Sequence, residues 1–161
     1  MNKLPLTTLC YIENEDSFLM MHRIKKEKDI NKDKWIGVGG HFEQAELNDP
    51  RACALRELRE ETGLTEESLE ELRLRYITLR MKNGEIRQNY YFFAELDNKT
   101  GDHIVSTEGI SRWFTLSELS VLEMPYTAKF VIEHYLKIGR RTNDMYVGVA
   151  DGERVNFTKL P

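Results

Sequence analysis

The sequence lacks the features typical of secreted proteins, of membrane-spanning proteins and of proteins stabilised by a structural metal ion. Its two cysteines, Cys10 and Cys53, match neither a disulfide framework nor a zinc site, so both are expected to be buried free thiols. No apolar run approaches the roughly 20 residues of a membrane span, and the first residues show no signal-peptide pattern. The four histidines lack metal-ligand spacing and are expected to be structural. We therefore expect a cytoplasmic protein with no membrane partner.

The chain also lacks a positive charge balance. Its net charge is −4, which offers no general attraction to a nucleic-acid polymer. A small anionic ligand would need local cations or a bound metal ion to overcome that field. No repeat, low-complexity segment or Pro/Gly/Ser-rich linker divides the 161 residues, so residues 1–161 are expected to form a single domain.

Alternating apolar segments and turn signals predict a mixture of strands and helices. The expected strands cover residues 6–13, 18–24, 35–38, 74–81, 86–96, 111–115, 145–149 and 155–159. Three hairpins are expected around Asn14-Glu15-Asp16, Asn83-Gly84 and Asp151-Gly152. A helix is expected over residues 125–137, and Ser117 is expected to cap a short helical turn. The pattern predicts an α/β (α+β) fold, with a mixed central sheet and helices packed on it.

The clearest helix lies between Asp49 and Gly63. Asp49 suits the N-cap, Pro50 suits the first helical position, and Gly63 suits the C′ position. At 3.6 residues per turn, Glu57 lies about 40° from Glu61 around the helix axis and about 60° from Glu60. These carboxylates repel one another and oppose the helix dipole.

Two interpretations of this carboxylate edge stay open at this point. It is either a solvated helix face, with Arg56 and Arg59 pairing along the helix, or a platform for a hard divalent cation such as Mg²⁺. The preceding glycine pair, the abrupt stop at Gly63, and the loop acids Glu43 and Glu46 favour the metal interpretation.

Residues 40–64, GHFEQAELNDPRACALRELREETGL, closely resemble the Nudix box, G-x5-E-x7-R-E-U-x-E-E-x-G-U, where U is aliphatic. The fixed positions are filled by Gly40, Glu46, Arg56, Glu57, Leu58, Glu60, Glu61, Gly63 and Leu64. One departure is that nine residues, not seven, separate Glu46 from Arg56. Pro50 stands six residues before Arg56, as in many family members, which assigns the extra pair to the loop near Leu47-Asn48.

The resemblance implies a Mg²⁺-dependent Nudix α/β/α sandwich hydrolase, with Mn²⁺ as an alternative metal. Arg56 matches the arginine that orients a catalytic glutamate, and either Glu57 or Glu61 is the expected general base. The implied metal ligands are the Gly39 carbonyl, Glu57, Glu60, Glu61 and Glu108. Glu108 has an equally good interpretation as a surface loop acid.

Outside the box, residues 6–9, 34–40 and 146–160 look like segments of MutT-type 8-oxo-dGTP hydrolases. That group places an asparagine where Ile36 stands, and a tryptophan and paired aspartates near Met124, Tyr126 and Thr127. Ile36 cannot make an asparagine's hydrogen bonds, so the base contacts must differ. The candidate substrate-binding residues are Arg23 for phosphate and Trp35 and Tyr126 for a base; a surface cation and two core aromatics are the alternatives.

The leading hypothesis is a pyrophosphohydrolase that converts a nucleoside triphosphate, with 8-oxo-dGTP as first candidate, to a monophosphate and pyrophosphate. The alternatives are Nudix enzymes for an unmodified nucleotide, a nucleotide sugar or a dinucleoside polyphosphate, and a non-catalytic Nudix-like nucleotide sensor. The expected partner is a small-molecule nucleotide and no nucleic-acid polymer, with the protein acting as a monomer or homodimer.

Overall fold

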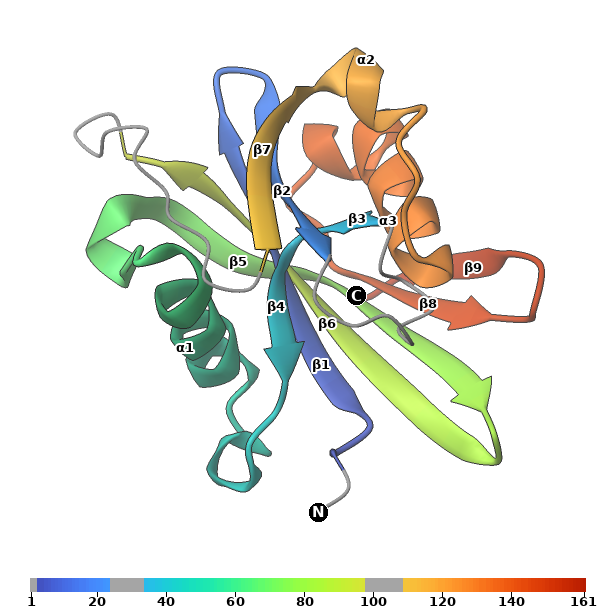
Figure 1. The fold of residues 1–161 in the computed structure, drawn as a ribbon. Helices are drawn as coiled ribbons and strands as arrows, with labels where there is room; N and C mark the ends of the chain where they lie inside the picture. The colour runs from blue at the N-terminus through green and yellow to red at the C-terminus, as the bar shows by residue number, and fades with distance from the viewer. Residues whose placement is uncertain (1–2, 24–33, 98–108) are drawn as a thin grey trace.

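The computed structural model describes residues 3–23, 34–97 and 109–161, apart from the side chains of Arg23 and Ile110. Nine strands in these ranges form one sheet (Figure 1): β1 Leu6–Asn14, β2 Ser17–Arg23, β3 Trp35–Ile36, β4 Val38–His41, β5 Leu69–Lys82, β6 Glu85–Leu96, β7 Gly109–Thr115, β8 Tyr146–Ala150 and β9 Val155–Lys159. The α-helices are α1 Pro50–Thr62, α2 Leu116–Leu119 and α3 Tyr126–Lys137. Three 3₁₀ turns are η1 Gln44–Glu46, η2 Glu66–Ser68 and η3 Gly139–Arg141.

The sheet is mixed, in the order β3-β2-β1-β6-β5-β8-β9, with β4 paired to β1 and β7 to β2. The β1–β6 and β5–β8 pairs are parallel and the other pairs are antiparallel. Helix α1 covers one face, and α3 with α2 lies on the other (Figure 1). This arrangement confirms the predicted fold class. No helix in the described ranges is long and apolar enough to cross a membrane.

The two faces of the sheet carry different cores, because successive side chains of a strand point to opposite faces. The α3 side is aromatic: the rings of Phe93 and Tyr135 stack with centroids 3.9 Å apart, beside buried Tyr11, Tyr76 and Tyr91. The α1 side is mainly aliphatic, and includes Ile12, Leu19, Val38, Leu58 and Leu96. Each face is therefore sealed by a different helix.

The three predicted hairpins are confirmed, and their turns use positive φ angles. Asp16 and Asn83 lie at φ 64° and 54°, and Gly84 and Gly152 at 74° and 99°. Asn, Asp and Gly tolerate this left-handed region best, which explains why these residues mark hairpins.

Three details differ from the sequence predictions. The short helix α2 is capped by Thr115, whose side chain accepts a hydrogen bond from the Glu118 amide at 3.3 Å, so the predicted cap at Ser117 is wrong. Strand β5 begins at Leu69, before the predicted residue 74, because irregular pairing near Glu70 hides its two-residue period. The strand predicted at 35–38 is divided at Gly37 into β3 and β4.

Strand β1 changes partner along its length, and this places the glycine pair under α1. Its residues Thr7–Cys10 pair with β4, whereas Glu13 and Asn14 pair with β2. Helix α1 has the predicted ends: Asp49 accepts a hydrogen bond from the Ala52 amide at 3.0 Å, and Gly63 closes the helix at φ 77°.

Candidate active site

Arg56 on α1 is the centre of an ionic network with Glu46. Its Nε lies 2.8 Å from Glu46 Oε2 and its Nη2 lies 3.0 Å from Oε1, so the guanidinium and the carboxylate pair through two parallel hydrogen bonds. Glu46 is only 7% exposed. The hydrogen bonds from Arg56 lower the pKa of the Glu46 carboxyl, and the same contacts raise the pKa of Arg56. Both groups are thereby held in their charged forms.

The remaining donors of Arg56 join α1 to β4. Nη1 lies 3.0 Å from Glu57 Oε1 and 3.2 Å from Glu60 Oε2. Nη2 also donates to the His41 carbonyl at 3.0 Å. A single guanidinium therefore fixes the loop before α1, the last residue of β4 and two carboxylates of the helix.

The two extra residues before the helix do not disturb this network. Leu47 and Asn48 form an exposed turn between η1 and α1, where the sequence places the insertion. Glu46 accepts a hydrogen bond from the Glu43 amide at 2.9 Å, which holds its carboxylate in place ahead of that turn. The longer spacing is absorbed outside the residues that contact Arg56.

The glycine pair of β4 receives the other carboxylates. The Gly39 amide donates to Glu61 Oε2 at 3.1 Å, and Glu61 is only 6% exposed. A Cβ added to Gly40 would lie 2.5 Å from Glu57 Oε1, and one added to Gly39 would collide with the Thr8 carbonyl. The glycine at position 40 therefore makes room for the Glu57 carboxylate, whereas the glycine at position 39 lets β4 lie close to β1.

The donor set suits a hard divalent cation, because Mg²⁺ and Ca²⁺ prefer carboxylate and carbonyl oxygens. Gly40 leaves the space that a carboxylate and its ion need. Within the described residues, however, no three His, Cys, Asp or Glu side chains converge to hold a metal ion. Glu57 and Glu60 each accept a hydrogen bond from Arg56 through one of their two carboxylate oxygens. The predicted ligand Glu108 lies outside the described residues.

Two of the predicted substrate-binding residues lie on the α3 side of the sheet: Trp35 packs against the core there, and Tyr126 is the first residue of α3. The half-buried Trp35 ring stacks on His22 with centroids 4.7 Å apart and meets Phe114 edge-on at 4.8 Å. The Tyr126 hydroxyl donates to the Arg154 carbonyl at 2.7 Å. Both rings thus have structural contacts of their own. Arg23 ends β2, and its side chain lies outside the described residues.

Sequence reasoning counted Glu46 among the loop acids that favour a metal site, but it did not predict the pairing of Glu46 with Arg56. It also missed the His41 carbonyl, because a backbone acceptor leaves no signal in the sequence. Both cysteines are buried free thiols, as predicted. Cys53 lies beside Arg56, yet burial raises the pKa of its thiol to about 11, so it is not a nucleophile.

Comparisons with known proteins give a matching domain model and several similar folds. A model of the NUDIX domain matches residues 3–135. The fold is similar to the mutator protein MutT of Bacillus halodurans, with a TM-score of 0.67, 20% identity and 96% of each chain covered. It is also similar to a C. elegans Ap4A hydrolase, with a TM-score of 0.66 and 16% identity over 85% of this chain and 98% of that chain. The E. coli dihydroneopterin triphosphate pyrophosphohydrolase gives a TM-score of 0.61 and 20% identity, covering 84% of this chain and 97% of that chain. At these identities the likeness establishes the fold, and the two names that state a substrate state different ones.

Proposed function

The chain belongs to the Nudix domain family of hydrolases, and from that premise we propose that it converts a nucleoside triphosphate to a monophosphate and pyrophosphate. Nudix hydrolases generally use divalent metal ions and act on small nucleotides; we propose Mg²⁺, with Mn²⁺ as an alternative. The observation that carries the proposal is the placement of Glu57 and Glu61 against Gly39 and Gly40, with Glu57 held by Arg56 at 3.0 Å.

The side chains of α1 have separate proposed tasks. Arg56 positions the Glu57 carboxylate, and the Gly39 amide positions Glu61. Glu57, Glu60 and Glu61, with the Gly39 carbonyl and Glu108, are the proposed metal ligands. A bound divalent ion supplies charge neutralisation at the diphosphate and lowers the pKa of an attacking water. Glu57 and Glu61 are the two candidates for the base that takes the water's proton.

The first substrate candidate is 8-oxo-dGTP, which the MutT-like segments support. The residues at the start of α3 indicate different base contacts from that group, however. Thr127 occupies about the sequence position at which the MutT-type group has an aspartate. Its hydroxyl accepts hydrogen bonds from Tyr91 at 3.0 Å and from Asn89 at 3.3 Å. The alternative substrates are therefore an unmodified nucleoside triphosphate, a nucleotide sugar and a dinucleoside polyphosphate.

A panel of these nucleotides, assayed with Mg²⁺ and with EDTA, tests both parts of the proposal. Activity should need the metal ion, and Glu61→Gln should lower kcat at least tenfold, equivalent to about 1.4 kcal/mol in the barrier. Glu133→Gln, which alters an exposed carboxylate on α3, is the matched control and should leave kcat unchanged. Turnover that persists in EDTA or survives Glu61→Gln would contradict the metal mechanism. A protein that binds nucleotides but cleaves none would be a sensor.

A further inference from the structure

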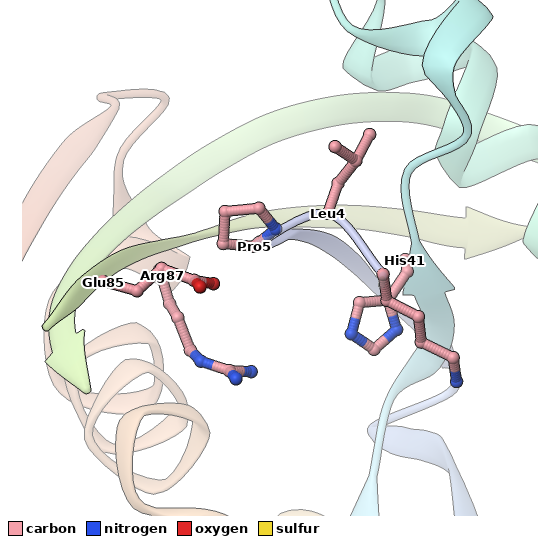
Figure 2. Close-up of a pocket in the computed structure, with 6 residues that line it drawn as sticks. Leu4, Pro5, His41, Glu85 and Arg87 are labelled. Atoms are coloured by element: carbon pink, nitrogen blue, oxygen red, sulfur yellow. The ribbon is translucent and has the colours of Figure 1, made fainter. Parts of the chain in front are cut away.

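A hollow lies beside the candidate site, between the N-terminal segment, β4 and β6. Its volume is about 330 Å³, within the range of small-ligand sites. Figure 2 shows the Arg87 guanidinium and the His41 imidazole reaching into it from opposite sides, with Leu4 and Pro5 between them. Lys3 and Glu85 complete the lining.

Only one strand separates this hollow from the candidate active site. The position of a Cβ on Gly40 faces Glu57 on α1. Because side chains alternate along a strand, His41 projects to the opposite face of β4. The His41 carbonyl meanwhile accepts a hydrogen bond from Arg56 at 3.0 Å. His41 therefore contributes backbone to the ionic network and its side chain to the hollow.

The lining is basic in a protein whose net charge is −4. Lys3 and Arg87 carry two permanent positive charges, and Glu85 supplies one carboxylate. In β5, Arg80 stands directly opposite Arg87, and like charges in that arrangement destabilise a strand pair. Arg80 lies over the Tyr126 ring, 5.1 Å from its centre, and does not line the hollow, so an anion bound there would offset the charge of Arg87 alone.

Arg87 also has an unmet hydrogen-bonding requirement. Its Nε is buried and has no hydrogen-bond partner in the part of the chain that the structure describes. A buried donor left in this state is costly. A guanidinium presents its donors as a planar fork that fits the oxygens of a phosphoryl group. Because Nε is closed to solvent, the terminal guanidinium nitrogens are the donors available to such a group in the hollow.

We propose that this hollow binds a phosphoryl group of the nucleotide substrate, held by Arg87 and Lys3, with His41 as a further donor. The inference rests on the proposed function and narrows it. A substrate that occupies the candidate active site and the hollow at once must carry a further phosphoryl group besides the two that flank the cleaved bond. Nucleoside triphosphates and dinucleoside polyphosphates meet this condition, whereas nucleotide sugars do not.

Pyrophosphate titrated calorimetrically into the full-length protein in EDTA tests binding without catalysis. Arg87→Gln should weaken pyrophosphate binding at least tenfold, because a charge-assisted contact is lost. Arg87→Lys should restore part of the affinity. Arg73→Gln, which removes the same charge from an exposed position of β5, should bind as the wild type does. Glu61→Gln should bind pyrophosphate at least as tightly as the wild type.

Steady-state kinetics tests whether the same group belongs to the substrate. Arg87→Gln should raise KM for the nucleoside triphosphate about tenfold, change kcat by less than about threefold, and leave KM for a nucleotide sugar unaltered. Unchanged pyrophosphate binding in Arg87→Gln, an equal loss in Arg73→Gln, or lost binding with an unchanged KM would each overturn the inference. The proposed function fails separately, if Glu61→Gln retains full activity.

Discussion

Arg56 and Arg75 are both anchored by several hydrogen bonds, but their partners differ in kind. Arg56 meets three carboxylates and one carbonyl on the α1 side of the sheet. Arg75 is 7% exposed and donates only to backbone carbonyls, those of Gly139 at 2.7 Å and of Asp144 and Thr142 at 2.9 Å. Its guanidinium also lies 5.8 Å from the centre of the Tyr135 ring.

Because their partners differ, the side-chain contacts of Arg56 can rearrange, whereas the backbone contacts of Arg75 cannot. Backbone carbonyls neither titrate nor rotate away, so Arg75 fastens η3 and the following loop to β5 under all conditions. The carboxylates of Glu57 and Glu60 belong to rotatable side chains, and both are proposed metal ligands. We therefore expect changes at Arg56 to affect catalysis first and changes at Arg75 to affect stability first.

Replacing each arginine by lysine should give the largest contrast. Lysine keeps the charge but cannot form the parallel pair with Glu46 or position Glu57. Arg56→Lys should lower kcat/KM about a hundredfold, equivalent to about 2.7 kcal/mol of transition-state stabilisation. Arg75→Lys should remain within about threefold of the wild type in the same assay at 25 °C. Equal losses would show that the two arginines do not have separate roles.

Arg75→Met should have the larger effect on stability. It leaves three carbonyls without their donor, and we expect the free energy of unfolding to fall by about 3 kcal/mol in urea titrations. Arg73→Gln, at an exposed position of the same strand, removes one hydrogen bond to Asn143 in that loop and should lower the unfolding free energy by only about 1 kcal/mol. A wild-type midpoint for Arg75→Met would mean that the loop after α3 has other anchors.

Mg²⁺ should stabilise the α1 side selectively. At a concentration one hundred times its dissociation constant, the ion should add about 2.7 kcal/mol to the unfolding free energy. Glu57→Gln should reduce this increment, whereas Arg75→Met should retain it, because only the first change removes a proposed ligand. Calorimetric melting with and without Mg²⁺ measures the increment. A full increment in Glu57→Gln would exclude Glu57 as a ligand.

The smallest expected difference between the Arg56 and Arg75 networks is in how the free energy of unfolding depends on pH. Arg56 lowers the pKa of Glu46 below its ordinary value of 4.5. The folded state therefore binds that proton less readily than the unfolded state, and stability falls as the pH decreases from about 4.5 through the lower folded pKa. Glu46→Gln should lack this decline, whereas Arg75→Met should show it in full, since its lost partners do not titrate. Urea titrations across this pH range test the difference.

Local chemistry predicted most of the fold. Turn residues with left-handed tolerance marked all three hairpins, and Asp49, Pro50 and Gly63 marked both ends of α1. The start of β5 was missed because pairing with β6 there is irregular, and irregular pairing removes the two-residue period. The parallel β1–β6 pair could not be read from the sequence, since its partners lie about eighty residues apart.

The candidate site likewise has one part that the sequence predicted and another part that it did not. Glu57, Glu60, Glu61 and Arg56 lie within one helix, so their spacing alone brought them together in the prediction. The contribution of the His41 carbonyl depends on the pairing of β4 with β1, which only the folded sheet specifies. The hollow lined by Arg87 and Lys3 was not predicted, because nothing local in the sequence links the first residues of β6 to the N-terminal segment.

The parallel β1–β6 pairing also orders events during synthesis. The ribosome completes β1, β4 and α1 by residue 62, but β6 begins only at residue 85. Until then, the strand that supports the glycine pair lacks its parallel neighbour, and contacts of such high sequence separation form late. Until then, β1, β2 and β4 cover the apolar side of α1, but the core on that face still lacks Phe92, Ala94 and Leu96 of β6. Translation pauses shortly after residue 62 should increase aggregation more than pauses after residue 96.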